Sequence, residues 1–167
     1  MNGLDIIIAL ILLAAVVWET RRGFGRALFD ALGLYAALWL ASAAAPALAA
    51  AVPVGPNLAQ HKAVCFSVAF LALGAGGLAL AHFVYESIQL NLGMLDKVLG
   101  VAAGLAVGLI VGHGLVQAIS TAGSGSSGES IVASSSLGEQ VLDFGSYHAT
   151  LDSMYSLTAP HPNNQPN

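Results

Sequence analysis

The chain has 167 residues, of which 56% are hydrophobic and only 8% are charged, and its mean hydropathy is +0.76. Soluble domains carry roughly 25% charged residues, so this composition excludes an ordinary soluble enzyme and favours a protein whose apolar faces are solvated by lipid. The formal net charge of −4 argues against nucleic-acid binding. The one cysteine, Cys65, lies in an apolar run and has no intrachain disulfide partner.

Four apolar segments follow one another at similar spacing and predict four transmembrane helices. A helix needs about 20 residues to cross a hydrocarbon core about 30 Å thick, and about 17 to 25 are tolerated. The expected spans are Leu4–Trp18, Ala27–Val52, Ala63–Tyr85 and Val98–Ile119. The first span is short unless it extends to Thr20, and the second contains Pro46, which predicts either a bend or a helix end near Ala45.

The composition changes after the fourth span. The stretch from Gly123 to Gly128 contains only glycine and serine, which is typical of a flexible linker. Beyond it, a weak helical spacing predicts one or two short amphipathic helices that lie on the membrane or pack on a partner. The spaced side chains are Leu137, Val141, Phe144, His148, Leu151 and Tyr155. The end, Pro160–Asn167, is expected to be disordered.

This pattern predicts an all-α, polytopic membrane protein with about four transmembrane helices and a flexible, partly helical C-terminal tail. The four-helix region covers residues 1–120, and the linker and polar tail cover residues 121–167.

Basic residues predict the orientation. Arg21, Arg22 and Arg26 lie in the first connection and Lys97 in the third, whereas the second connection has only Lys62. Basic residues close to span ends are retained on the cytoplasmic side. The count of four against one therefore predicts that both termini lie outside the cytoplasm.

The fourth segment carries a glycine at every fourth position: Gly100, Gly104, Gly108 and Gly112. On a helix with about 3.6 residues per turn these glycines form one stripe, along which another helix can approach closely. Two interpretations remain open. The stripe packs against another helix of the same chain, or it acts as a glycine zipper that joins copies into an oligomer around a pore.

The basic residues Arg21, Arg22 and Arg26 also have two interpretations. They anchor the cytoplasmic side of the first two spans, or they contact anionic lipid head groups. Arg26 and Asp30 stand four residues apart and can pair on one helix face, which would ease the burial of Asp30.

Two acids stand at the starts of spans. Asn2 and Asp5 match an N-cap followed by an acid at the third helical position, and Asp96 is placed to cap the fourth span. The alternative is that Asp5 and Asp96 mark an ion or proton path, because acids inside a membrane are usually functional.

Three further titratable side chains do not favour a proton relay. His82 and Glu86 lie near the end of the third span, whereas His113 lies about 22 Å into the fourth at about 1.5 Å per residue. Antiparallel neighbours would keep them apart. Placement at the membrane interface is expected for His82 and Glu86, and a hydrogen bond between helices for His113.

Signatures of catalysis are absent from the sequence. It contains no G-x-S-x-G elbow, no H-E-x-x-H pair and no phosphate-binding loop, and no Cys/His cluster has metal-ligand spacing. We therefore expect a protein that is not an enzyme and uses no metal or cofactor.

Three motifs, in this order and spacing, resemble the colicin V production protein (CvpA) family. They are Asn2–Ile8, Arg22–Phe24 and Leu95–Gly100 leading into the glycine stripe. The resemblance implies a small inner-membrane protein of bacteria, associated with production or export of a peptide toxin and with envelope tolerance. It implies no catalytic residue. The family-like positions are Asp5, Arg22, Gly23, Phe24, Asp96, Gly100, Gly104 and Gly108.

Together with the apolar spans, this resemblance implies a non-enzymatic inner-membrane accessory protein in toxin production or export, or in envelope homeostasis. It would act by helix packing and association, with the lipid bilayer around it and a second copy or another membrane protein as partner. The alternative is a subunit of a small oligomeric channel or transporter built on the glycine-striped fourth helix.

Overall fold

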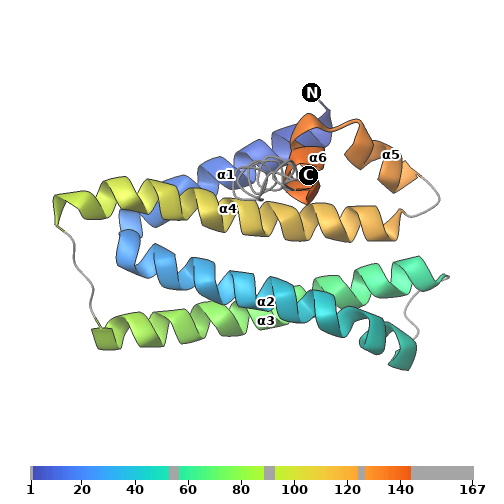
Figure 1. Ribbon diagram of the computed structural model, residues 1–167, viewed down its shortest axis with the longest axis horizontal. Coiled ribbons are helices and arrows are strands. Elements are labelled where there is room, and N and C mark those ends of the chain that lie inside the picture. The colour runs from blue at the N-terminus through green and yellow to red at the C-terminus, as the bar shows by residue number, and fades with distance from the viewer. Residues whose placement is uncertain (1, 53–56, 89–92, 124–126, 144–167) are drawn as a thin grey trace, which may run out of the picture.

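The computed structural model describes residues 2–52, 57–88, 93–123 and 127–143. Every regular element in these ranges is an α-helix (Figure 1). The helices are α1 (Gly3–Arg22), α2 (Phe24–Ala51), α3 (Leu58–Ile88), α4 (Met94–Ala122), α5 (Ser127–Ala133) and α6 (Ser136–Asp143). The first four are long and apolar enough to cross a membrane, which confirms the all-α, multi-pass class.

All four long helices begin before the apolar segments that predict them, and all but α2 also end beyond them. The first has 20 residues, about 30 Å at about 1.5 Å per residue, so it reaches the length of a full span. The second continues through Pro46 to Ala51, so the expected helix end near Ala45 is wrong. Proline removes one backbone hydrogen bond because it has no N–H. A membrane helix that packs against neighbouring helices tolerates this loss.

The long helices form two pairs that pack on each other. In Figure 1, α1 and α4 lie side by side in one layer, and α2 and α3 lie side by side in the other. Helix α4 contacts both helices of the second pair, so it joins the layers.

Alanines fill much of the contact between the layers, beside a few large side chains such as Leu38 and Phe66, and many other large apolar side chains point outward. The buried positions of α2 include Ala31, Ala37, Ala41 and Ala45. In contrast, Trp39 is 66% exposed and Leu71 is 71% exposed. This inverted arrangement is expected in lipid, where close packing rather than burial of large apolar side chains holds helices together.

The first two spans are separated by one residue only. Gly23 has a φ of +89°, which glycine adopts without the strain that a side chain would bring. The polar connection expected from Glu19 to Arg26 therefore lies mostly within helices, because α1 ends at Arg22 and α2 begins at Phe24.

Helices α5 and α6 fold back onto the long helices of their own chain. Val132 of α5 and Val141 of α6 join Leu4, Ile8 and Val116 in one buried cluster. Of the expected tail pattern, Leu137 also packs against this cluster. The positions from Phe144 to Tyr155, the end from Pro160, and residues 124–126 of the linker lie outside the described residues.

Candidate functional site

Charged side chains of α1 and α2 meet beside the Gly23 turn, at what we call the basic end of the bundle, where Arg21, Arg22, Arg26 and Lys97 lie. Arg22 Nη1 lies 2.7 Å from Asp30 Oδ2 and 3.2 Å from Glu19 Oε1. The side chains of Asp30 and Glu19 are 0% and 4% exposed. Two buried carboxylates thus share one guanidinium, which ties α1 to α2.

The three arginines have different surroundings. Arg21 is exposed, as a lipid or interfacial anchor would be, whereas Arg22 turns inward and its guanidinium lies 5.9 Å from the Trp18 ring centroid. Arg26 is half-buried. The partner that holds Asp30 within hydrogen-bonding distance is Arg22, eight residues away, and not Arg26 as the i, i+4 spacing suggests.

Several buried polar atoms around Arg22 keep unused hydrogen-bonding capacity. Among the described residues, the unpartnered atoms are Glu19 Oε2, Thr20 Oγ1, Arg26 Nε and Asp30 Oδ1. A buried charge without a partner is costly, so the two buried carboxylates depend on the Arg22 guanidinium to neutralise them.

Asp96 connects the basic ends of α4 and α2. Its Oδ1 accepts a 3.1 Å hydrogen bond from the backbone N–H of Phe24, the first residue of α2. The N-cap of α4 is Gly93, a glycine that has no side chain with which to cap the helix. Asp96 is therefore not the N-cap residue of the fourth span but lies in its first turn, and its carboxylate accepts from the first N–H of the second span. Gly23 makes this contact possible, because a Cβ there would collide with the Asp96 carboxylate.

The glycine stripe of α4 faces α1 of the same chain. A Cβ at Gly104 would lie 2.8 Å from Val16 Cα, and a Cβ at Gly108 would lie 3.0 Å from Leu12 Cα. Real Cβ atoms essentially never come within 3.0 Å of another atom, so Gly104 requires glycine, whereas a side chain at Gly108 would need its neighbours to shift by a few tenths of an ångström.

The two ends of the stripe are less crowded. A Cβ at Gly100 would meet Thr20 Cα at 3.4 Å, and one at Gly112 would meet Ile8 Cγ2 at 3.9 Å. The whole stripe, from Gly100 to Gly112, is thus used within the chain, which is the first of the two interpretations of the sequence.

Asp5 joins the start of α1 to the start of α6, at the end of the bundle that we call the N-terminal end. Asn2 caps α1, with its side chain accepting from the Asp5 N–H while Asp5 Oδ2 accepts from the Asn2 N–H at 2.7 Å. Asp5 Oδ1 also accepts from Ser135 Oγ at 2.6 Å and from the Leu137 N–H at 3.0 Å. Both oxygens of Asp5 therefore serve helix caps rather than an open ion path.

Ser135 completes the second cap. Its hydroxyl oxygen accepts from the Gly138 N–H at 2.9 Å, and the residue is fully buried. Sequence reasoning missed Ser135 and Gly138, although a serine run directly before Leu137 is a helix-start signal. No local sequence pattern indicates that Ser135 lies next to Asp5, which is 130 residues away in the chain.

The histidines lie where a relay cannot join them. His82 Nε2 lies 3.2 Å from Glu86 Oε1 on the exposed face of α3, near the basic end. His113 Nδ1 lies 2.8 Å from the carbonyl oxygen of Val141 in α6, toward the N-terminal end. Since a carbonyl only accepts, Nδ1 carries the proton in this contact.

The second helix pair crosses at Gly33 of α2 and Gly77 of α3. A Cβ on either glycine would lie 2.8 Å from the carbonyl oxygen of the other. Sequence reasoning missed this crossing, although Gly74–Gly77 carries three glycines in four residues.

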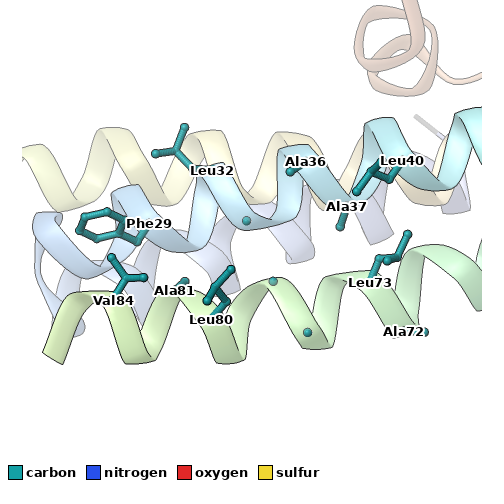
Figure 2. A pocket seen from close by; sticks show the side chains of 13 residues that line it. Phe29, Leu32, Ala36, Ala37, Leu40, Ala72, Leu73, Leu80, Ala81 and Val84 are labelled. Carbon is teal, nitrogen blue, oxygen red and sulfur yellow. The ribbon is translucent and has the colours of Figure 1, made fainter. Parts of the chain in front are cut away.

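An apolar groove of about 500 Å³ runs along this crossing (Figure 2). Small residues such as Ala36, Ala72 and Gly76 line it together with Phe29 and Leu80. Figure 2 shows Phe29 of α2 and Val84 of α3 on the facing sides of the two helices, whereas Leu32 points away from α3. A Cβ at Gly76 would meet no heavy atom within 4 Å, so this glycine is not required by the packing of the chain itself.

Among the described residues, no group of three His, Cys, Asp or Glu side chains is placed to hold a metal ion. The polar clusters at the two ends bind helices to one another, and the groove between α2 and α3 remains open. These features define a multi-pass helical membrane protein held together by glycine contacts and buried caps.

The chain belongs to the colicin V production protein family. The model of that family matches residues 4–145, which include all four spanning helices, α5 and α6. Comparisons with curated proteins and with solved structures found no match.

Proposed function

We propose that this chain is a non-enzymatic accessory protein of the bacterial inner membrane. It serves production or export of a peptide toxin, or homeostasis of the envelope, by packing against another membrane protein. The observation that carries this proposal is the open groove between α2 and α3, in a bundle whose other glycine surface is already occupied.

The groove has the composition that helix association in lipid requires. Apolar surface alone gives no driving force there, because lipid tails are equally apolar, whereas small residues allow close backbone contact. Ala36, Ala72 and Gly76 supply such a surface, and every residue that lines the groove is apolar. The occupant that fits is one apolar transmembrane helix of a partner protein.

The packing does not favour a channel or transporter built on the striped helix. Such an assembly needs Gly104 and Gly108 on an outward surface, and α1 covers both. A bulky substitution such as Gly104→Ile would therefore disturb the packing within one chain rather than test association between copies.

Crosslinking in native membranes tests the proposal. A photoreactive residue at Ala36, in the groove, should capture one partner, and Gly76→Leu in the same chain should reduce that capture at least tenfold by filling the groove. Gly76→Ala should leave it unchanged, because the position has room for a methyl group. The matched control is a photoreactive residue at the exposed Leu10 of α1.

Three outcomes would contradict the proposal. Equal capture at Leu10 would show non-specific collision, and capture insensitive to Gly76→Leu would show that the groove is not the contact. Capture of a second copy alone would replace the accessory partner with a homo-oligomer.

We also propose that both termini lie outside the cytoplasm. Four of the five Lys and Arg residues gather at the basic end, opposite Asn2 and α6 (Figure 1). In a Cys65→Ala background, Ser136→Cys should react in whole spheroplasts with a thiol reagent that does not cross membranes, and Lys97→Cys should not. The reverse labelling would invert the orientation.

A further inference from the structure

A second cavity lies at the N-terminal end, where α2, α3 and α4 converge. It has a volume of about 150 Å³, well above the ~10–15 Å³ that one water needs. Its polar lining comes from all three helices: Ser42 of α2, Lys62 of α3, and Gln117 and Thr121 of α4. It is separate from the groove between α2 and α3, whose lining shares none of these residues.

The hydrogen bonds around this cavity leave donors and acceptors available. Ser42 Oγ donates its one hydrogen to the Leu38 carbonyl at 2.9 Å, a shorter contact than the 3.4 Å to Gln117 Oε1, and it accepts from Gln117 Nε2 at 3.3 Å. The second N–H of the Gln117 amide remains available. Pro46, also in the lining, has no N–H to donate to the carbonyl of Ser42.

Lys62 brings a positive charge to this polar lining. It is the one Lys or Arg between Arg26 and Lys97, and it is half-buried. Among the described residues, no carboxylate lies within ion-pair distance of its ammonium group. A partly desolvated cation beside a polar cavity is stabilised by an anion.

The depth of the cavity indicates which anion it meets. Helix α3 has 31 residues, about 46 Å at about 1.5 Å per residue, which exceeds a hydrocarbon core of about 30 Å. Lys62 follows Leu58, the first residue of α3, by about 6 Å along the helix axis. The ammonium therefore lies in the head-group layer, where phosphate is the prevailing anion.

We propose that this cavity binds a phosphate group, with Lys62 as its charge partner and the Gln117 amide as a hydrogen-bond donor. The phosphate belongs to an anionic glycerophospholipid of the bilayer or to free phosphate in the adjoining water. Lysine is a common phosphate ligand as a point charge. This site is independent of the groove and of any protein partner.

Native mass spectrometry of the full chain in detergent, with equal phosphatidylglycerol and phosphatidylethanolamine, tests the lipid source. To test whether the ligand is free phosphate, inorganic phosphate is titrated in and the thermal unfolding temperature is measured at each concentration. The variants are Lys62→Gln, Lys62→Arg and Gln117→Leu, and the matched control is Lys97→Gln, which removes the same charge from an exposed position at the opposite end. Circular dichroism verifies that each variant is folded.

We expect phosphatidylglycerol to be retained by the natural chain, by Lys62→Arg and by Lys97→Gln. Lys62→Gln should weaken binding by about tenfold or more, since bonds to charged groups are the strong ones, and Gln117→Leu should weaken it less. Stabilisation by inorganic phosphate, lost in Lys62→Gln alone, would assign the site to free phosphate. If neither ligand binds, or if Lys62→Gln and Lys97→Gln bind equally well, the proposal is overturned.

Discussion

The two helix pairs use glycine in different ways. In the α1–α4 pair, glycines on α4 recur at every fourth position from Gly100 to Gly108 and lie against the backbone of α1. In the α2–α3 pair, Gly33 and Gly77 meet each other at one crossing, and a groove opens along it. A repeated stripe closes an interface from end to end, whereas a single reciprocal crossing leaves surface for a further partner.

Loss of the charged tie between the pairs should have the largest effect. Arg22→Ala removes the guanidinium that holds Glu19 and Asp30, and leaving buried charges unpaired costs about 3–5 kcal/mol. We expect a large drop in the thermal unfolding temperature in detergent. Arg21→Ala, which removes the same charge from an exposed position, should have little effect. Equal effects of the two substitutions would show that the buried tie is not a stabilising contact.

A side chain added in the α1–α4 interface should have the next largest effect on stability. Gly104→Ala places a methyl group 2.8 Å from Val16 Cα, and overpacking of this kind costs about 1–3 kcal/mol. Gly112→Ala, in the same stripe, should cost much less because its nearest contact would be 3.8 Å away. Thermal unfolding of the two variants measures this contrast. If the two cost the same, the stripe does not pack on α1 as described.

In the α2–α3 pair, substitutions at the adjacent glycines Gly76 and Gly77 should have different effects on stability. Gly77→Ala should destabilise the chain by about 1–3 kcal/mol, because the methyl group would reach the Gly33 carbonyl, whereas Gly76→Ala should be neutral. Chemical denaturation in detergent can compare the two. A neutral Gly77→Ala would mean that α2 and α3 do not cross at that glycine.

The smallest effect is expected at the cap that holds α6. Ser135→Ala removes one hydroxyl that donates to Asp5 and accepts from Gly138, which should cost about 1–2 kcal/mol. Limited proteolysis should then cut α6 faster while the four long helices stay protected. Ser136→Ala, at an exposed neighbour, is the control, and equal cleavage of both variants would argue against the cap.

Local patterns predicted the spans, the N-cap pair of Asn2 and Asp5, and the family, because each depends on residues close in sequence. Contacts between distant segments were not predictable in the same way. Asp96 has the position of a cap for its own helix, yet the turn at Gly23 brings the first N–H of another helix within its reach. The spacing of Arg26 and Asp30 likewise suggested a pair that Arg22 takes instead.

The glycine patterns show the same limit. Regular spacing from Gly100 to Gly112 predicted a close-packed face, but periodicity carries no information about which helix covers it. The isolated Gly33 has no periodic neighbour that would single it out, and its role depends on the crossing with Gly77. Small residues in a membrane segment thus predict close contact, while the partner depends on the topology of the bundle.

A disulfide between α1 and α4 tests most directly that the stripe is used within one chain. Ile8→Cys and Gly112→Cys, combined with Cys65→Ala, place two thiols at a position where a Cβ on residue 112 would lie 3.9 Å from Ile8 Cγ2. Mild oxidation in native membranes should give an intrachain disulfide, seen by mass spectrometry as a crosslinked peptide pair from a monomer. A disulfide-linked dimer in its place would contradict the account and return the stripe to an interface between chains.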